Sequence, residues 1–518
     1  MSELPAKSFH QIVFENAMQW PKRTYVHCID QNKSLTYGDL YSVSNQAAQF
    51  LKAYDIQAND RVLLLAENSV ENLAVFISVL RYGATLATVH VEMNQSHLSE
   101  IIKAIAPKIV LYQEGLGLES LQENAPGVWL ALGEWEDDNR KATGWFAEIA
   151  ALSDEDNIKT VASPDDHGVI FYTSGTVAKP KGVIQTHATA YFNYDATADY
   201  LQLAPGDKTF DCRSYSWLSA QHMSLGAPLV AGATTIITKH FSQSRYFECL
   251  KTYEVNVGFV VPTIVNMLIN RPHEIHGRDL PHLRFLTSSS APLLEEQWRN
   301  FEELYGIRLA QSCGSSEGGN TAAHIGAARK VGTIGPAQKY QDIRIVDGAG
   351  NSMAQGETGE IIVGGGKQQA FGYLLLDGTI ERLPEDGHHS GDLGFFDVDS
   401  HLHITGRVKE LIIRGGMNIA PLEIDAVLIM HPDVTDAGTI GVPHPIYGEE
   451  VVAYVTCLPG KAVSYAEILA HCEDLLPEAK RPKAVYVLGE LPKNSRGKLD
   501  RSEILTHYED NHAKTIDW

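Results

Sequence analysis

Short apolar runs alternate with stretches of helical spacing along roughly the first 330 residues. The run 61–65 predicts a buried strand, and residues 72–82 have the apolar spacing of a helix that ends at Gly83. Three further short runs, with helical patterns between them, lie at residues 234–238, 257–261 and 284–287. This alternation predicts parallel sheets that are covered by helices.

The pattern changes after Gly335, where shorter predicted strands are separated by Gly and Asp turns. These strands lie at residues 343–346, 360–363 and 401–404, and they predict a small β-rich subdomain. Roughly the last 110 residues predict a separate α+β unit. Pro421 suits the first turn of a helix, Ser464 and Glu467 form a capping box before another helix, and residues 483–488 predict a strand.

Composition narrows the class of protein. The 518 residues carry a net charge of −22, which argues against a general nucleic-acid binder and against binding to an anionic membrane. Six scattered cysteines without a C-x-x-C motif predict reduced thiols. The first 20 residues lack a signal-peptide pattern, and we find no apolar run as long as a membrane span. We therefore expect a cytoplasmic protein.

The most informative segment is residues 172–183, which follow the apolar run 169–171. Hydroxyls, glycines and lysines in such a loop can donate to phosphate oxygens and offset their charge. The candidate phosphate contacts are Thr173, Ser174, Gly175, Thr176 and Lys181. The chain has no Walker loop to compete with this segment. Its Gly-Lys pairs stand at 366–367 and 497–498, and neither has the glycine before it or the Ser or Thr after it that a Walker loop requires. From these residues alone, a solvated turn is an equal alternative.

A second cluster, residues 312–319, places the carboxylate of Glu317 among glycines and hydroxyls. Such a carboxylate can hold Mg²⁺, although a plain Ser/Gly turn is the simpler interpretation. The pattern Gly314-x-Ser316-x-Gly318 also satisfies the nucleophile elbow of serine hydrolases. That elbow needs a helix directly after the serine, and the following Gly-Gly-Asn is a poor helix start.

Three more segments carry possible chemistry, and each alone is more simply a turn, a linker or a surface loop. Asp392 beside a glycine turn can accept hydrogen bonds from a ribose diol. The charged residues 406–410 suggest a hinge, followed by a Gly-Gly loop at 415–416. Lys498 lies on a basic loop that could reach a developing phosphate charge.

In this order and spacing, the motifs resemble the acyl-adenylate-forming superfamily, which includes acyl-CoA synthetases, adenylation domains of nonribosomal peptide synthetases and firefly luciferase. The resemblance extends from about residue 10 to about residue 505. It implies an α/β fold whose large N-terminal domain, residues 1–406, has two α/β subdomains and a small β-barrel. It also implies a small mobile α+β domain at residues 407–518, which carries the catalytic lysine.

The resemblance implies a role for each motif. Residues 173–182 would hold the β- and γ-phosphates of ATP, and Ser289, Ser290 and Ala291 would form the adenine-side loop. Glu317 would bind Mg²⁺, with Thr176 as a further metal contact, and Ser316 would lie near the α-phosphate. Asp392 and Arg407 would hold the ribose, Lys409 would be the hinge, and Lys498 would be the catalytic lysine. Gly415 and Gly416 would line the channel for coenzyme A.

The implied chemistry has two steps. A carboxylate attacks the α-phosphorus of ATP and expels pyrophosphate, and a thiol then attacks the acyl-adenylate to give a thioester and AMP. The chain departs from the usual motifs at Val177-Ala178, which replaces Thr-Gly, and at Cys313, which replaces a tyrosine. A histidine gate found in many CoA ligases aligns, to within a residue, with Ser216.

A CoA ligase is the favoured member of the family. A stand-alone enzyme that loads a carrier protein, a luciferase-like oxygenase and a non-catalytic acyl-nucleotide sensor are alternatives. The partners would be ATP, CoA and a small carboxylic acid, without nucleic acid and with a possible homodimer. Small and apolar residues of the predicted pocket suit a medium-chain, aromatic or betaine-like acid. They are Tyr215, Ser216, Trp217, Val260, Val261, Ile264, Met267, Gly318 and Gly319.

Overall fold

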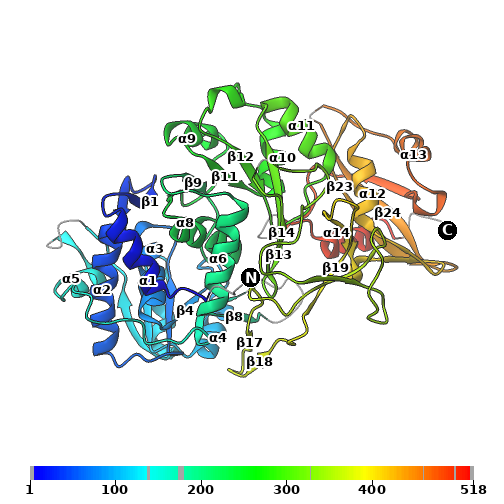
Figure 1. The fold of residues 1–518 in the computed structure, drawn as a ribbon. Helices are drawn as coiled ribbons and strands as arrows, with labels where there is room; N and C mark the ends of the chain where they lie inside the picture. Colours follow the sequence, from blue (N-terminus) through cyan, green and yellow to red (C-terminus); the bar gives the residue numbers. More distant parts are fainter. Residues whose placement is uncertain are drawn as a thin grey trace.

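The computed structural model describes residues 5–136, 141–172, 180–326, 328–458, 460–494 and 498–513. Figure 1 shows an N-terminal part built on two mixed sheets, followed by a smaller C-terminal unit at one end of the molecule. No helix in these described ranges combines the length and the apolar character needed to cross a bilayer. All six cysteines are free, as the sequence predicts.

The first eight-stranded sheet lies next to the predicted phosphate loop. Its strands follow the order β18 (Ile380–Arg382), β17 (Gly372–Leu374), β8 (Gly182–Thr186), β7 (His167–Tyr172), β4 (Thr85–Thr88), β3 (Arg61–Leu65), β5 (Ile109–Tyr112) and β6 (Val128–Ala131). The strands from β7 to β6 are parallel, whereas β7, β8, β17 and β18 pair in antiparallel fashion. The predicted strand at 61–65 is confirmed as β3.

The second eight-stranded sheet is parallel except at its two edges. Its order is β14 (Gly319–Ala323), β13 (Leu309–Ser315), β12 (Phe285–Ser288), β11 (Val257–Val260), β9 (Lys208–Asp211), β10 (Thr234–Ile237), β1 (Thr24–Cys28) and β2 (Lys33–Thr36). Antiparallel pairs occur only at β1–β2 and β13–β14 among its described pairings. Because parallel strands end at a common edge, β9, β11 and β12 deliver their last residues to one side of the sheet.

Helices fill the space between and around these sheets. The core joins side chains from both sheets to helix α3 (Val70–Tyr82), in which every residue is buried. The predicted helix end is confirmed, because Gly83 caps α3 with a positive φ of 103°. The other helices of the N-terminal part are α1 (Phe9–Gln19), α2 (Tyr37–Ala53), α4 (Gln95–Ile105), α5 (Gly144–Ala150), α6 (His187–Tyr200), α7 (Leu218–Ala220), α8 (Ala227–Ala231), α9 (Tyr246–Thr252), α10 (Pro262–Asn270) and α11 (Glu295–Tyr305).

The predicted β-rich subdomain is confirmed as a four-stranded antiparallel sheet. Its order is β15 (Ile343–Val346), β16 (Gly359–Val363), β19 (His388–Phe396) and β20 (Leu402–Arg407). These pairings form an open path among the described residues, in the place where the sequence predicts a small barrel. Strand β20 runs to Arg407, one residue past the predicted domain boundary at 406/407.

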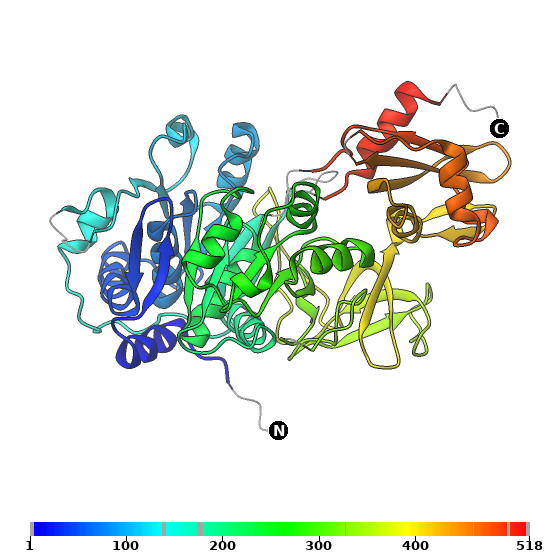
Figure 2. The same cartoon turned by 90° about the horizontal axis from the view of Figure 1, so that it is seen from above.

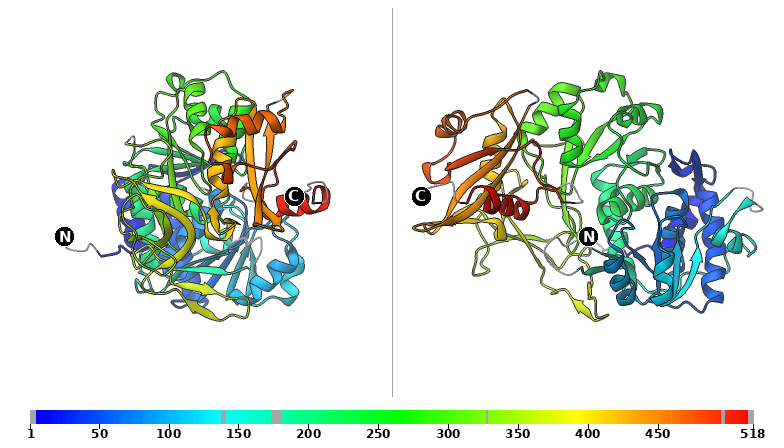
Figure 3. Two further views of the ribbon diagram at one scale, coloured as in Figure 1. Left: turned by 90° about the vertical axis from the view of Figure 1, so that its right-hand side faces the viewer. Right: turned by 180° about the vertical axis from the view of Figure 1, so that it is seen from behind.

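The C-terminal unit has its own sheet and core, which confirms the predicted α+β unit. The sheet follows the order β22 (Met417–Ile419), β21 (Ile412–Arg414), β24 (Gly448–Cys457) and β23 (Val434–His444), and β25 (Ala484–Val487) pairs with β24. Its helices are α12 (Pro421–Ile429), α13 (Tyr465–Glu473) and α14 (Arg501–Asn511). The predicted capping box at Ser464 and Glu467 is present. Figures 2 and 3 show this unit beside the end of the molecule that carries the four-stranded sheet.

Candidate functional site

The loop predicted to bind phosphate connects two paired strands. Tyr172 ends β7 and pairs with Gly182 at the start of β8, so the loop closes an antiparallel hairpin. Thr173, Ser174, Gly175 and Thr176 lie outside the described residues, as do Val177 and Ala178. Lys181 is described: its ammonium lies 4.5 Å from the centre of the Tyr373 ring and 3.8 Å from the Glu381 carboxylate.

Glu317 lies in the turn between β13 and β14, at the edge of the second sheet. Strand β14 pairs with β13 directly after this turn, so a strand follows Ser316 where a hydrolase elbow would need a helix. The serine-hydrolase alternative is therefore wrong. Ser316 is partly exposed in the same turn.

A tyrosine from the first sheet orients the Glu317 carboxylate. The Tyr373 hydroxyl donates to Glu317 Oε1 at 2.9 Å, and Glu317 Oε2 lies 3.9 Å from His388 Nε2. Burial, together with the neighbouring Glu317 charge, holds the pKa of Tyr373 well above its usual value. Because Tyr373 also lies under Lys181, one ring connects the end of the phosphate loop with the predicted metal ligand.

The donor set around Glu317 fits Mg²⁺ only in part. The described residues hold no group of three or more His, Cys, Asp or Glu side chains that could enclose a metal. Magnesium usually takes one or two carboxylates and completes its shell with water and phosphate oxygens. Glu317 therefore suits a Mg²⁺ ion that arrives with a nucleotide, and it does not suit a metal held by the protein alone.

Asp392 and Arg407 face each other across β19 and β20. Arg407 Nε lies 3.0 Å from Asp392 Oδ1, and the two residues are register partners. Burial raises the pKa of Asp392, and the charges of Arg407 and Lys498 only partly oppose this effect. Burial also raises the pKa of Cys313, at the end of β13, to about 12.

Lys498 reaches this site from the C-terminal unit. Its charge acts on both Asp392 and Cys313, which come from two different sheets of the N-terminal part. The backbone N–H of Lys498 donates to Asn494 Oδ1 at 3.1 Å. Lys498 therefore lies near enough to act electrostatically on Cys313 and on Asp392, the ion-pair partner of Arg407.

The predicted hinge follows directly after β20. Lys409 is exposed within a short 3-10 turn, Val408–Glu410. Arg501, just beyond Lys498, is 3.0 Å from Glu410 and 2.6 Å from the buried Asp425. The lysine loop is thus tied both to the hinge and to the core of the C-terminal unit.

The glycine pair forms the turn of a hairpin on the C-terminal sheet. Gly415 and Gly416 have φ values of 59° and 84°, a conformation that strongly favours glycine. Both are exposed, and the N–H of Gly415 donates to the carbonyl of Tyr447 within the same unit. The backbone hydrogen bonds described for this hairpin therefore lie within the C-terminal unit.

The predicted adenine-side loop follows β12. Ser289 is buried and its Oγ accepts from Arg213 Nη1 at 3.1 Å. Ser290 has a positive φ of 75°, which is uncommon for a residue other than glycine and often marks a functional loop. Ala291 is partly buried.

The residues of the predicted acyl pocket differ widely in their exposure. Tyr215 is a core residue, because its side chain is 1% exposed and its hydroxyl donates to the carbonyl of Ser224. Val260 and Ile264 also belong to a hydrophobic core, whereas Met267 is 43% exposed. Trp217, which is partly buried, stacks on His90 with ring centres 6.2 Å apart.

The remaining pocket predictions occupy the edges of the same region. Ser216 is partly buried and its hydroxyl pairs with that of Ser214 at 2.8 Å. Val261 packs against the core from a partly buried position. Gly318 and Gly319 are buried behind Glu317, and Gly319 has a φ of 70°.

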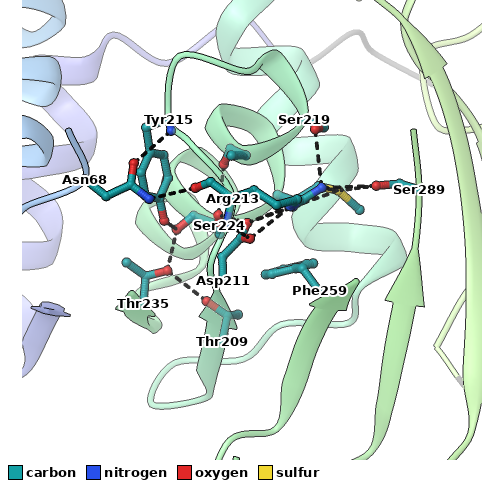
Figure 4. A network of polar contacts seen from close by, with 12 residues as sticks. Asn68, Thr209, Asp211, Arg213, Tyr215, Ser219, Ser224, Thr235, Phe259 and Ser289 are labelled. Carbon is teal, nitrogen blue, oxygen red and sulfur yellow. Dashed lines mark hydrogen bonds and ion pairs between the residues drawn. The ribbon is translucent and has the colours of Figure 1, made fainter. Parts of the chain in front are cut away.

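Two groups of residues that sequence reasoning missed lie beside these motifs. The first is the single residue Tyr373. Its neighbour Gly372 is only a weak sequence signal for a functional position. The other is a buried polar network around Asp211 and Arg213 (Figure 4). The signal for that network would have been the opposite charges of Asp211 and Arg213, two residues apart in the sequence.

Sequence and structure comparisons identify relatives over nearly the whole chain. A sulfoacetate–CoA ligase of Cupriavidus necator is 29% identical over 96% of this chain and 97% of its own length. An oxalate–CoA ligase of Arabidopsis thaliana is 28% identical over 92% of this chain and 94% of its own. A fatty acid–[acyl-carrier-protein] ligase of Streptomyces coeruleorubidus is 26% identical over 98% and 97%.

The structural match is equally broad. The crystal structure of ATP-bound MatB from Rhodopseudomonas palustris superposes with a TM-score of 0.88 at 25% identity, over 98% of this chain and 99% of MatB. The family model described as "AMP-binding enzyme" matches residues 13–374, and its companion, "AMP-binding enzyme C-terminal domain", matches residues 423–498. The chain therefore belongs to the AMP-binding enzyme family.

Proposed function

We propose that this protein is an ATP-dependent carboxylate–CoA ligase that forms an acyl-adenylate and then an acyl-CoA. The observation that carries the proposal is the position of Lys498, whose charge reaches Asp392 and Cys313 from the other unit of the chain. A cation delivered in this way suits a reaction in which negative charge builds on phosphate oxygens. Relatives that are named CoA ligases over more than nine-tenths of the chain support the same class.

In the first step, an oxygen of the substrate carboxylate bonds to the α-phosphorus of ATP, and the bond to the bridging oxygen breaks to release pyrophosphate. Lys498 offsets the charge on the reacting oxygens. The Asp392 carboxylate accepts hydrogen bonds from the ribose hydroxyls, and Arg407 keeps that carboxylate oriented. Thr173, Ser174, Gly175, Thr176 and Lys181 hold the outer phosphates.

Glu317 would hold a Mg²⁺ ion, and the ion would offset negative charge on the phosphate oxygens. The chain's own contribution is to fix the carboxylate. Tyr373 donates to Glu317 Oε1, and Oε2 lies 3.9 Å from His388 Nε2.

In the second step, the thiol of CoA attacks the acyl carbonyl and AMP leaves. We propose that the C-terminal unit turns about Lys409, which withdraws Lys498 and brings in the hairpin of Gly415 and Gly416. The exposed hinge and the exposed hairpin support this role. A cytoplasmic location and a homodimer stay predictions from the sequence.

The test is to measure pyrophosphate release with ATP and a panel of acids, with and without CoA. Release with a particular acid, and AMP turnover sustained only with CoA, is the expected result. Turnover sustained by an acyl-carrier protein and not by CoA would favour carrier loading instead, an activity named for one relative. Absence of pyrophosphate release with every acid would contradict the ligase.

A further inference from the structure

A buried ion pair lies at the carboxyl end of β9, outside the motifs assigned above. The side chains of Asp211 and Arg213 are 0% and 2% exposed. Arg213 Nε donates to Asp211 Oδ1 at 2.9 Å, and Arg213 Nη2 donates to Asp211 Oδ2 at 2.7 Å. Asp211 also accepts from the Ser224 hydroxyl at 2.5 Å, so its charge is fully compensated (Figure 4).

The third nitrogen of the guanidinium is directed away from Asp211. Arg213 Nη1 donates to Ser289 Oγ at 3.1 Å and to Ser219 Oγ at 3.3 Å. Ser289 belongs to the adenine-side loop, and Ser219 lies two residues after Trp217 in the predicted substrate segment. One buried arginine therefore links the nucleotide side with the acyl side.

The segment that supports this network is itself unusual. Residues Gln221–Gly226 form a π-helix, a rare geometry that is found frequently at functional sites. Met223 in this turn contacts Arg213 and Ser289 through its sulfur, and Ser224 bonds to Asp211. His222 contacts Gln185, on the strand after the phosphate loop. The π-helix thus connects parts of the site that are far apart in sequence.

A buried ion pair of this kind rarely adds stability, because removing two charges from water costs about as much as their attraction returns. The ion pair instead fixes the orientation of the Arg213 guanidinium, which donates to the hydroxyls of Ser219 and Ser289. Ser289 donates its own proton to the Met223 sulfur, whereas the Ser219 hydroxyl, which also accepts from Arg213, keeps its proton for another acceptor. Ser219 is only partly buried, so its hydroxyl can donate to a ligand.

We propose that Arg213, acting through Ser219, selects short acids that carry a second, acceptor-rich anionic group such as a carboxylate or a sulfonate. This inference rests on the proposed ligase function and names its substrate class. Of the apolar residues that would suit a longer alkyl or aromatic acid, Val260 and Ile264 are packed in a hydrophobic core and Met267 is 43% exposed. Ser219 is the specificity residue, and Arg213 is a positioning residue.

The experiment measures acid-dependent ATP–pyrophosphate exchange with two sets of acids of similar length. One set has a second anionic group (sulfoacetate, malonate and succinate), and the other is neutral beyond its carboxylate (propionate, butyrate and hexanoate). The wild-type enzyme should prefer one member of the first set. Ser219→Ala should lower kcat/KM for that acid by about tenfold or more, since it removes a hydrogen bond to a charged group, and should leave the neutral acids within about twofold.

Ser214→Ala is the matched control, because it removes a hydroxyl from the same loop that pairs with Ser216 and not with Arg213. It should not change the preference. Arg213→Lys keeps the positive charge but loses the planar guanidinium that bonds to Asp211 and Ser219 at once. Like Ser219→Ala, it should reduce the preference for the acid with a second anionic group.

Two results would overturn the inference. A wild-type preference for the neutral acids would do so while leaving the ligase intact, because exchange would still occur. Equal losses for both sets in Ser219→Ala would assign the residue a purely structural role. If no acid supports exchange, the proposed function fails and the inference fails with it.

Discussion

The hydrogen bond between Tyr373 and Glu317 allows a sharp test of the predicted metal site. Tyr373→Phe removes one oxygen and keeps the ring over which Lys181 lies. A hydrogen bond to a charged group contributes about 1.5–3 kcal/mol, and its partial exposure here favours the lower value. Since 1.4 kcal/mol is a factor of ten, we expect the apparent affinity for Mg²⁺ to fall about tenfold, as is typical for residues that orient a metal ligand.

The assay is ATP–pyrophosphate exchange titrated with Mg²⁺, alongside calorimetric binding of Mg·ATP. Raising the Mg²⁺ concentration should restore most of the rate, because the carboxylate remains and only its orientation is weakened. Tyr340→Phe is a control with similar chemistry, since the Tyr340 hydroxyl donates to the Asp195 carboxylate at 2.8 Å and Lys339 lies over its ring. An unchanged Mg²⁺ dependence in Tyr373→Phe, or an equal change in Tyr340→Phe, would refute the reasoning.

Three other perturbations test other parts of the site. Lys409→Pro fixes φ at the proposed hinge, and should spare pyrophosphate release while slowing thioester formation at least tenfold in single-turnover assays; equal rates for both steps would exclude the hinge. Arg501→Leu leaves Asp425 buried without its ionic partner and should lower the free energy of unfolding by about 3–5 kcal/mol in urea titrations, so that a loss below about 1 kcal/mol would contradict the assigned packing. Asp392→Asn should weaken ATP binding and yet raise the melting temperature at neutral pH. Because burial raises the pKa of Asp392, the stabilising contribution of this residue is present at low pH and is lost as pH rises through that pKa. The gain in melting temperature in Asp392→Asn should therefore shrink at acidic pH, and a gain that grew there would contradict the reasoning.

Local sequence signals predicted the fold well where the physics is local. The run 61–65 became β3, Gly83 capped α3 through its left-handed backbone, and Ser464 with Glu467 formed the expected capping box. Each of these depends on residues close together in the chain. The pairing order of the two large sheets depends on contacts across the whole chain, and periodicity does not contain that information.

Site residues that belong to one short motif could be predicted from the sequence, whereas contacts between distant segments could not. Asp392, Arg407 and Lys498 were each identified within a short segment, and the structure brings them together. Tyr373 was missed because its partner Glu317 is 56 positions away in the chain. The acyl pocket stays a prediction, because the packing of Val260 and Ile264 in a core is a tertiary property that an apolar residue type does not reveal.

The position of Lys498 is the central claim, and separate half-reactions test it most directly. Lys498→Ala should slow formation of acyl-adenylate by about 10²–10³, the usual cost of removing one preorganised electrostatic group. It should leave thioester formation from preformed acyl-adenylate and CoA within a few-fold of wild type. Lys493→Ala, on the same loop but paired with Asp436 at 2.9 Å, is the control and should leave both steps nearly unchanged. Equal loss of both steps in Lys498→Ala, or loss of neither, would contradict the account.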